Sequence, residues 1–342
     1  MGICISKASS HEIHDVDYGH ENVIYYQDTI TDHKIGSLDT HQGSKGFNQD
    51  AAIIYQDYGM KNGVFGGVFD GHGRNGQIVS KFVRNKLPSL VINQRNATMT
   101  KGNKTVNDQD EFKSKDFHIW KEACYSAFKV MDKEIKLMEH IDCSCSGTTA
   151  VIVIRQGEEL VIANLGDSRA VLGTIAENGI TPVQLTVDLK PSVPSEADRI
   201  RKSNGRVMAL REEPHIDRVW LPHHDSPGLA MSRAFGDFVL KSHGIIAVPD
   251  VSYHRLTPND QFLVLASDGV WDVLSNNTVA SIVWGAESEE SAAKAIIVAA
   301  IAAWKQKFPS SKRDDCSAVC LFLQNKPQQD LYNTPTDSDC NT

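Results

Sequence analysis

Short apolar runs that end in turn residues recur along this chain and predict its strands. Residues 64–69 are almost entirely apolar or glycine and have the length of a buried strand. Residues 150–154, 160–163 and 261–267 have the same character, and glycine-rich turns lie beside them. Short strands separated by such turns indicate an antiparallel sheet.

Other segments have the period of a helix. Apolar residues recur at helical spacing over 76–92 and 120–138, and residues 195–203 also look helical. The alanine-rich stretch 292–304 is too short for a membrane span and contains Lys294, so we predict a core-facing helix there.

Polar stretches between these elements predict loops and tails. Residues 93–116 are rich in Asn, Lys, Asp and Thr and predict a solvated loop, whereas 211–227, with several prolines, predict a flap or long surface loop. Residues 1–34 predict an N-terminal tether, and 325–342 predict a disordered tail. Without a linker or repeat inside the remainder, we expect one domain over 35–324.

Composition narrows the class of protein. The chain has 342 residues, 41% of them hydrophobic, which suffices for a sizeable core. A net charge of -8 gives no electrostatic support for a nucleic-acid partner and disfavours a metal-dependent nuclease. The 7 cysteines are odd in number and lack C-x-x-C spacing, so we expect reduced thiols in an intracellular protein.

The first six residues fit a lipidation pattern. Gly2 follows Met1, and Ser6 completes the motif for myristoylation. Cys4 is positioned for palmitoylation, the second acyl chain that stable anchoring requires. The alternative is a chance Met-Gly start. The pattern predicts a cytoplasmic protein with membrane contact, at the inner face of the plasma membrane.

Aspartates accompany the predicted strands. One aspartate at a strand end is usually only a turn residue, but Asp-Gly follows two separate apolar runs, at 70–71 and 268–269. Strand ends in packed sheets share a rim, and carboxylates that meet there repel unless hard cations neutralise them. Since zinc-type Cys/His spacing is missing, Mg²⁺ or Mn²⁺ is favoured. The aspartates beside strands are Asp50, Asp70, Asp167, Asp268, Asp272 and Asp314.

Taken together, these stretches resemble the protein phosphatase 2C family of metal-dependent Ser/Thr phosphatases. The resemblance follows the family's order from about residue 35 to 323, and the RVWLP run at 218–222 and the N-terminus resemble a plant subgroup. It implies an α+β fold, a central sandwich of two antiparallel sheets flanked on both faces by helices. The matching stretches are NQD (48–50), VFDGHG (68–73), SGTTA (146–150), NLGDSR (164–169), LAMSRAFGD (229–237), ASDGVWD (266–272) and DDCS (314–317).

The resemblance also implies a core site for two Mg²⁺ or Mn²⁺ ions. Asp70 would bridge the ions, and the backbone carbonyl of Gly71 would bind one of them. Asp268 and Asp314 would hold the other ion, although the sequence leaves open whether the neighbouring residue 315 replaces Asp314. Asp50 would act through metal-bound water.

Further residues receive roles in the same way. Asp167 and Asp272 resemble a weaker third-metal site. Lys45 stands where many members have a phosphate-binding Arg, and it offers a point charge in place of a planar fork. Gln49 replaces a common Glu and removes one negative charge. His72 is placed to protonate the departing Ser or Thr oxygen, the alternative being a structural imidazole in a turn.

We therefore expect a Mg²⁺/Mn²⁺-dependent enzyme that hydrolyses phosphoserine and phosphothreonine in proteins by in-line attack of water. The alternative is a pseudophosphatase that binds phosphoproteins in signalling without turnover. A binding module gains nothing from holding like charges together, which argues against it. The expected partners are phosphoprotein substrates, with protein kinases or receptor-type regulators beside them.

Overall fold

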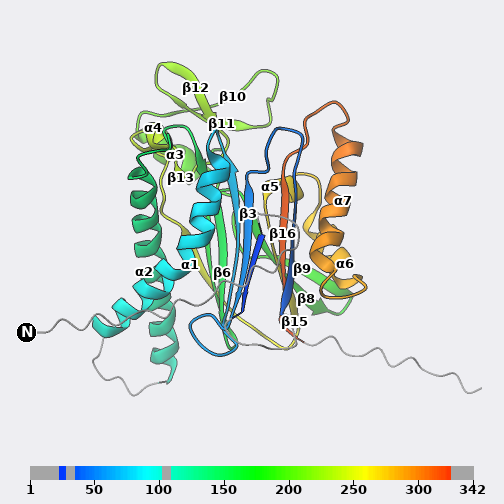
Figure 1. The fold of residues 1–342 in the computed structure, drawn as a ribbon. Coiled ribbons are helices and arrows are strands. Elements are labelled where there is room, and N and C mark those ends of the chain that lie inside the picture. The colour runs from blue at the N-terminus through cyan, green and yellow to red at the C-terminus, as the bar shows by residue number, and fades with distance from the viewer. Residues whose placement is uncertain (1–22, 28–34, 102–108, 325–342) are drawn as a thin grey trace, which may run out of the picture.

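Two sheets packed face to face form the centre of the protein, and helices cover the outer face of each (Figure 1). The structure, a computed structural model, describes residues 23–27, 35–101 and 109–324. The predicted α+β sandwich flanked by helices is confirmed.

The larger sheet has the strand order β1-β3-β4-β6-β7-β14, and the short β5 and β13 continue from the end of β4. Neighbouring strands along this order are antiparallel, except that β1 pairs with β3 in parallel. Its strands are β1 (Val23–Gln27), β3 (Asp50–Gln56), β4 (Val64–His72), β5 (Gly147–Thr148), β6 (Ala150–Gln156), β7 (Glu159–Leu165), β13 (Phe235–Gly236) and β14 (Asp250–Arg255).

The second sheet is wholly antiparallel, with the order β2-β16-β15-β8-β9. The last strand within the described ranges, β16, is inserted between β2 and β15. The strands are β2 (Gly36–His41), β8 (Arg169–Ala176), β9 (Gly179–Gln184), β15 (Asp260–Ala266) and β16 (Cys316–Phe322).

The strand β4 shows why the apolar runs are continuous. Val64 and Val68 lie in the core between the two sheets, whereas Phe65 and Phe69 lie in the core beneath the helices. Successive side chains of a strand point to opposite faces, so a strand covered on both faces has no polar alternation.

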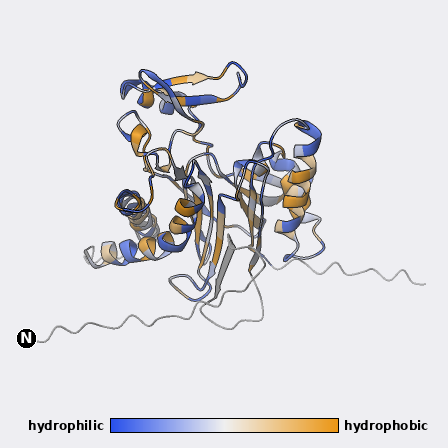
Figure 2. Ribbon diagram, turned by 45° about the horizontal axis from the view of Figure 1, so that its top comes forward, coloured by the Kyte–Doolittle hydropathy of each residue, from blue (hydrophilic) through white to orange (hydrophobic). Residues whose placement is uncertain are grey.

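Helices complete the layers. Figure 1 shows α1 and α2 over the larger sheet and α6 and α7 over the other, and Figure 2 shows hydrophobic residues along the strands and the covering helices. None of the helices in the described ranges is long and apolar enough to cross a membrane. The helices are α1 (Gly76–Lys101), α2 (Gln109–Lys136), α3 (Pro194–Lys202), α4 (Phe238–Lys241), α5 (Asp268–Trp271), α6 (Asn276–Trp284) and α7 (Ala292–Lys307).

A third, small sheet projects at one end of the sandwich (Figure 1). It consists of β10 (Arg206–Ala209), β11 (Asp217–Leu221) and β12 (His224–Leu229). The predicted flap or long surface loop over 211–227 is therefore largely regular, because β11 lies within it and β12 begins in it. Val219 and Leu229 are buried with Ile200 in a separate apolar cluster, and the prolines fit because Pro222 lies in the hairpin turn and Pro227 on an edge strand.

Two further predictions about irregular segments are wrong. The expected loop 93–116 is largely helical, because α1 runs to Lys101 and α2 begins at Gln109. The two helices support each other there: the guanidinium of Arg95 lies 4.5 Å from the ring centre of Trp120. The expected tether 1–34 contains β1, whose Val-Ile-Tyr-Tyr sequence favours a strand.

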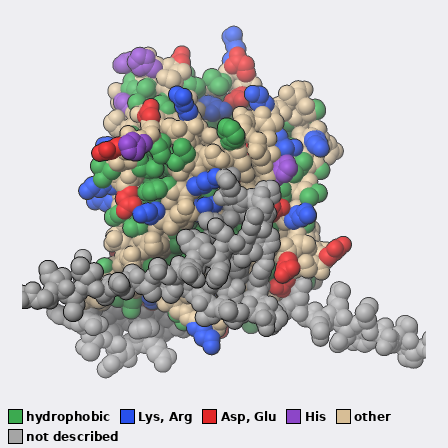
Figure 3. Space-filling view, in the orientation of Figure 1, with side chains coloured by type: hydrophobic (Ala, Val, Ile, Leu, Met, Phe, Trp, Pro, Cys, Tyr) green, Lys and Arg blue, Asp and Glu red, His purple; other side chains and the backbone are tan. Residues whose placement is uncertain are grey.

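Other predicted features fall outside the described residues. These are the lipidation pattern at Gly2 and Cys4 and the tail 325–342. On the face seen in Figure 3, the Lys and Arg side chains of the described residues are interspersed with Asp and Glu.

Candidate active site at the rim of the two sheets

Both sheets bring aspartates to one end of the sandwich. Asp50 begins β3 and lies opposite Asp70 in the register of β3 with β4. Asp268 follows β15 as the first residue of α5, and Asp314 lies two residues before β16. The antiparallel pairing of β15 with β16 places these last two residues at the same end of the second sheet.

The carboxylates are close enough to perturb one another. Asp50 is 1% exposed and accepts a hydrogen bond from Ser267 Oγ at 2.7 Å. Burial, and next the charge of Asp315, raises the pKa of Asp50 to about 7. Burial and the charges of Asp50 and Asp268 raise the pKa of Asp70 well above its usual range.

Asp268 joins this group to a second pair of carboxylates. Burial, followed by the charges of Asp167, Asp314 and Asp272, raises the pKa of Asp268 well above its usual range. Asp167 is 3% exposed, and its Oδ1 has no hydrogen-bond partner. Burial raises the pKa of Asp167 to about 6, against the opposing charge of Lys190. The structure thus brings all six predicted aspartates into one electrostatically linked cluster.

The donor set of this cluster fits hard cations. Within the described ranges, no three Asp, Glu, His or Cys side chains already surround a common point as metal ligands do. Yet crowded, buried carboxylates destabilise one another, and the Asp167 Oδ1 is a buried acceptor without a donor. Oxygen donors without Cys or His favour Mg²⁺ or Mn²⁺ over zinc.

The neighbours Asp314 and Asp315 have different environments. The Asp315 carboxylate accepts backbone hydrogen bonds from Gly43 at 2.6 Å and Gln49 at 2.7 Å, so it holds the loop before β3. The Asp314 carboxylate instead pairs with the ammonium of Lys45. Asp315 thus holds a loop, whereas Asp314 is bound only to a lysine at the rim; that Asp314 is the metal ligand stays a prediction.

Lys45, the predicted phosphate-binding residue, lies at the rim of the cluster. Its side chain is 54% exposed, and its ammonium is bound to Asp314. A charge at this place can meet a phosphate that approaches the aspartates. The contact with phosphate stays a prediction.

His72 ends β4 and forms a pair with Asp237 that the sequence did not reveal. The His72 Nε2 lies 2.6 Å from Asp237 Oδ2, and Asp237 is 1% exposed. Burial lowers the pKa of His72, but Asp237 outweighs it, and the net shift is upward. The Nδ1 atom of the ring is buried without a partner. The carboxylate favours the protonated imidazole that an acid catalyst needs.

The backbone at Asp237 is unusual. Its φ of 49° lies in the left-handed region, which non-glycine residues rarely adopt, and its N–H donates to the Ser146 carbonyl at 3.0 Å. A Cβ at Gly147 would lie 2.5 Å from Asp237 Oδ2 and 2.9 Å from His72 Nε2. The left-handed backbone at Asp237, and the absence of a side chain at Gly147, thus allow the two side chains to meet.

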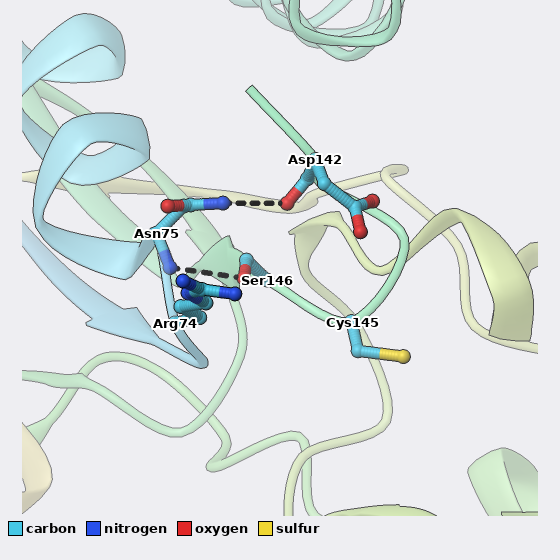
Figure 4. A pocket seen from close by; sticks show the side chains of 5 residues that line it. All are labelled: Arg74, Asn75, Asp142, Cys145 and Ser146. Atoms are coloured by element: carbon cyan, nitrogen blue, oxygen red, sulfur yellow. Dashed lines mark hydrogen bonds between the residues drawn. The ribbon is translucent and has the colours of Figure 1, made fainter. Parts of the chain in front are cut away.

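A small cavity adjoins this pair. It has a volume of about 260 Å³ and is lined by Arg74, Asn75, Asp142, Cys145 and Ser146 (Figure 4). The Asn75 amide donates to the Asp142 carbonyl at 2.8 Å, and its backbone N–H donates to Ser146 Oγ at 3.1 Å. Ser146, which lines the cavity, also accepts the backbone hydrogen bond of Asp237 through its carbonyl.

Glu196 of α3 fixes the segment that carries Asp237. It is 2% exposed and accepts hydrogen bonds from Ser232 Oγ at 2.6 Å and from Arg233 at 2.7 and 2.9 Å. Arg199 forms a further ion pair with it at 2.7 Å. Burial raises the pKa of Glu196, but these donors outweigh it and lower the pKa to about 2.

We expect Glu196→Gln to lower the free energy of unfolding at pH 7 by on the order of 3 kcal/mol, because it leaves two partly buried arginines without their counter-charge. Since the folded-state pKa is depressed, the ionised Glu196 stabilises the fold above the unfolded pKa. The difference in the free energy of unfolding between the variant and wild type should therefore become smaller as the pH falls from about 4.5 toward 2. Urea denaturation at several pH values measures both effects. Glu158→Gln, at an exposed ion pair with Arg255, is the control and should change stability by less than about 1 kcal/mol.

Comparisons with known proteins agree with this architecture. Residues 28–307 match the family model described as Protein phosphatase 2C. The chain is 52% identical to "Probable protein phosphatase 2C 72" of Arabidopsis thaliana, covering 96% of this chain and 99% of that protein. It is 46% identical to "Probable protein phosphatase 2C 12" of Oryza sativa subsp. japonica, covering 95% and 92%.

A solved structure of a family member has a similar fold. The crystal structure of serine-threonine phosphatase 2C from Toxoplasma gondii matches with a TM-score of 0.75 at 26% identity, covering 84% of this chain and 94% of that chain. The chain belongs to the protein phosphatase 2C family. Within that family it is of the plant type, and it is a hydrolase, a protein Ser/Thr phosphatase.

Proposed function

We propose that this phosphatase is Mg²⁺- or Mn²⁺-dependent and removes phosphate from phosphoserine and phosphothreonine in proteins. The observation that carries the proposal is the convergence of aspartates from both sheets beside the His72–Asp237 pair. Asp70, the Gly71 carbonyl, Asp268 and Asp314 would hold the cations of the core site. When bound, such cations lower the pKa of water and offset the charge of the phosphoryl group.

Three side chains of the protein would carry out the remaining steps of the hydrolysis. Asp50, oriented by Ser267, is placed to accept a hydrogen bond from water in the cluster. Lys45 can bind a phosphate oxygen as a point charge. His72, whose pKa is raised by Asp237 against the effect of burial, can release a proton to the departing Ser or Thr oxygen.

The test is phosphate release from a phosphothreonine peptide by the full chain, with Mn²⁺ or with EDTA. We expect release only with the cation, and recovery when Mn²⁺ is added back in excess of EDTA. If no release occurs while circular dichroism shows an intact fold, the proposal is wrong. The chain would then bind phosphoproteins without turnover.

We also propose phosphoprotein substrates as partners, beside protein kinases or receptor-type regulators, and an acylated N-terminus that brings the enzyme to the inner face of the plasma membrane. The support is the Met-Gly-Ile-Cys-Ile-Ser sequence, which offers sites for two acyl chains. One myristoyl chain alone binds membranes only marginally.

Gly2→Ala should therefore move the protein from the membrane to the soluble fraction, because it removes the myristoylation site. Cys4→Ser should give an intermediate distribution, since one chain is left. Fractionation of cells that express tagged wild type and both variants measures this. Equal partitioning of wild type and Gly2→Ala would contradict the lipid anchor.

A further inference from the structure

The acidic cluster contains a second lysine, Lys190, beside Asp167 and Asp272. Its Nζ lies 3.5 Å from Asp272 Oδ1. Of the charges around Asp167, that of Lys190 most strongly favours the ionised carboxylate, whereas Asp272 and Asp188 oppose it. Two carboxylates thus share one ammonium group.

The backbone fixes Lys190 in this position. The preceding residue, Leu189, is buried and donates its N–H to the Gly166 carbonyl at 2.9 Å, next to Asp167. The Leu189 carbonyl accepts hydrogen bonds from the Ser232 N–H at 2.8 Å and from its Oγ at 2.6 Å. The loop that carries the lysine is therefore bound to the turn that carries the aspartate.

Asp167 shows that the ammonium does not satisfy the site fully. Its side chain is 3% exposed, and its Oδ1 accepts no hydrogen bond. A buried acceptor without a donor is costly, so its persistence points to a ligand that binds there. A divalent cation could supply the missing bond, but its charge would repel the ammonium.

We propose that Lys190 is a built-in counter-charge that competes with a divalent cation for Asp167 and Asp272. Without the cation, the ammonium compensates the two carboxylates and stabilises the turn. With the cation, the lysine must move away, so the affinity of this pair for Mg²⁺ or Mn²⁺ is low. The inference rests on the proposed function only in the choice of cation.

The test is calorimetric titration of the cation-free full chain with Mn²⁺ alone. Lys190→Met removes the charge and keeps the length of the side chain, and we expect its weakest class of Mn²⁺ sites to bind about tenfold more tightly than that of wild type. Lys190→Arg keeps the charge and should stay within about twofold of wild type. In the double variant Lys190→Met/Asp167→Asn, the gain should disappear.

Thermal melting in EDTA checks that each variant folds, and Lys190→Gln replaces Lys190→Met if the latter does not. Unchanged affinity in the uncharged variant would overturn the proposal, as would equal tightening in Lys190→Arg. Phosphopeptide hydrolysis, measured separately, distinguishes the two failures. Cation-dependent activity with unaltered titrations rejects only the role of Lys190, whereas the absence of Mn²⁺ binding in every variant rejects the proposed cation as well.

Discussion

Asp268→Asn is expected to lower kcat/KM for a phosphothreonine peptide by more than about 100-fold and to raise the Mn²⁺ concentration needed for half-maximal rate. The reason is the central place of Asp268, whose pKa is raised first by burial and then by the charges of Asp167, Asp314 and Asp272. Asparagine keeps the shape of the side chain but removes a negative charge, so the remaining carboxylates would hold a cation less tightly.

The opposite end of the same strand provides the control. Asp260 begins β15, eight positions before Asp268 in the sequence, and binds His254 and Thr257 away from the cluster. Asp260→Asn should lower stability and leave the Mn²⁺ dependence of the rate unchanged. If Asp268→Asn kept both its turnover and its Mn²⁺ dependence, the metal assignment of Asp268 would be wrong.

Asp237→Asn is expected to lower kcat for the phosphothreonine peptide by roughly 10- to 100-fold and to change KM little, because Asp237 is buried and positions His72. Asparagine tolerates the left-handed backbone that Asp237 adopts, so the variant removes the charge without forcing the turn open.

The leaving group separates this role from a purely structural one. A p-nitrophenyl phosphate releases an oxygen that needs no proton, so Asp237→Asn should slow its hydrolysis far less than that of the peptide. His72→Gln should show the same selectivity, and the double variant should be little slower than either single variant, because the pair acts as a unit. Equal losses on both substrates would show that Asp237 only supports the fold.

The local sequence pattern predicted the strands and the aspartates at their ends well. Both faces of a strand such as β4 are buried and need apolar residues, whereas the charged residues follow where the apolar run stops. It failed where a distant partner decides the structure. The polar residues after 93 are helical because α1 and α2 pack on each other, and residues 23–27 form a strand because β3 offers an edge.

The candidate site divides in the same way. Asp70 and Asp268 could be found because each follows an apolar run directly. The partners of this acidic rim could not: Asp237, Lys190 and Glu196 are joined to their contacts by loops, and only the fold brings them together. Asp237 adopts the left-handed backbone conformation although it is not a glycine, so the residue type at 237 gave no signal of this turn.

The order of synthesis differs from the order of strands in the second sheet. β16, which is synthesised after every other described strand, lies between β2 and β15. Asp315, which immediately precedes β16, binds the loop that leads to Asp50. A nascent chain therefore cannot close this sheet or assemble the acidic cluster until β16 emerges. Proteolysis ahead of β16 would separate this central strand from the rest of the second sheet.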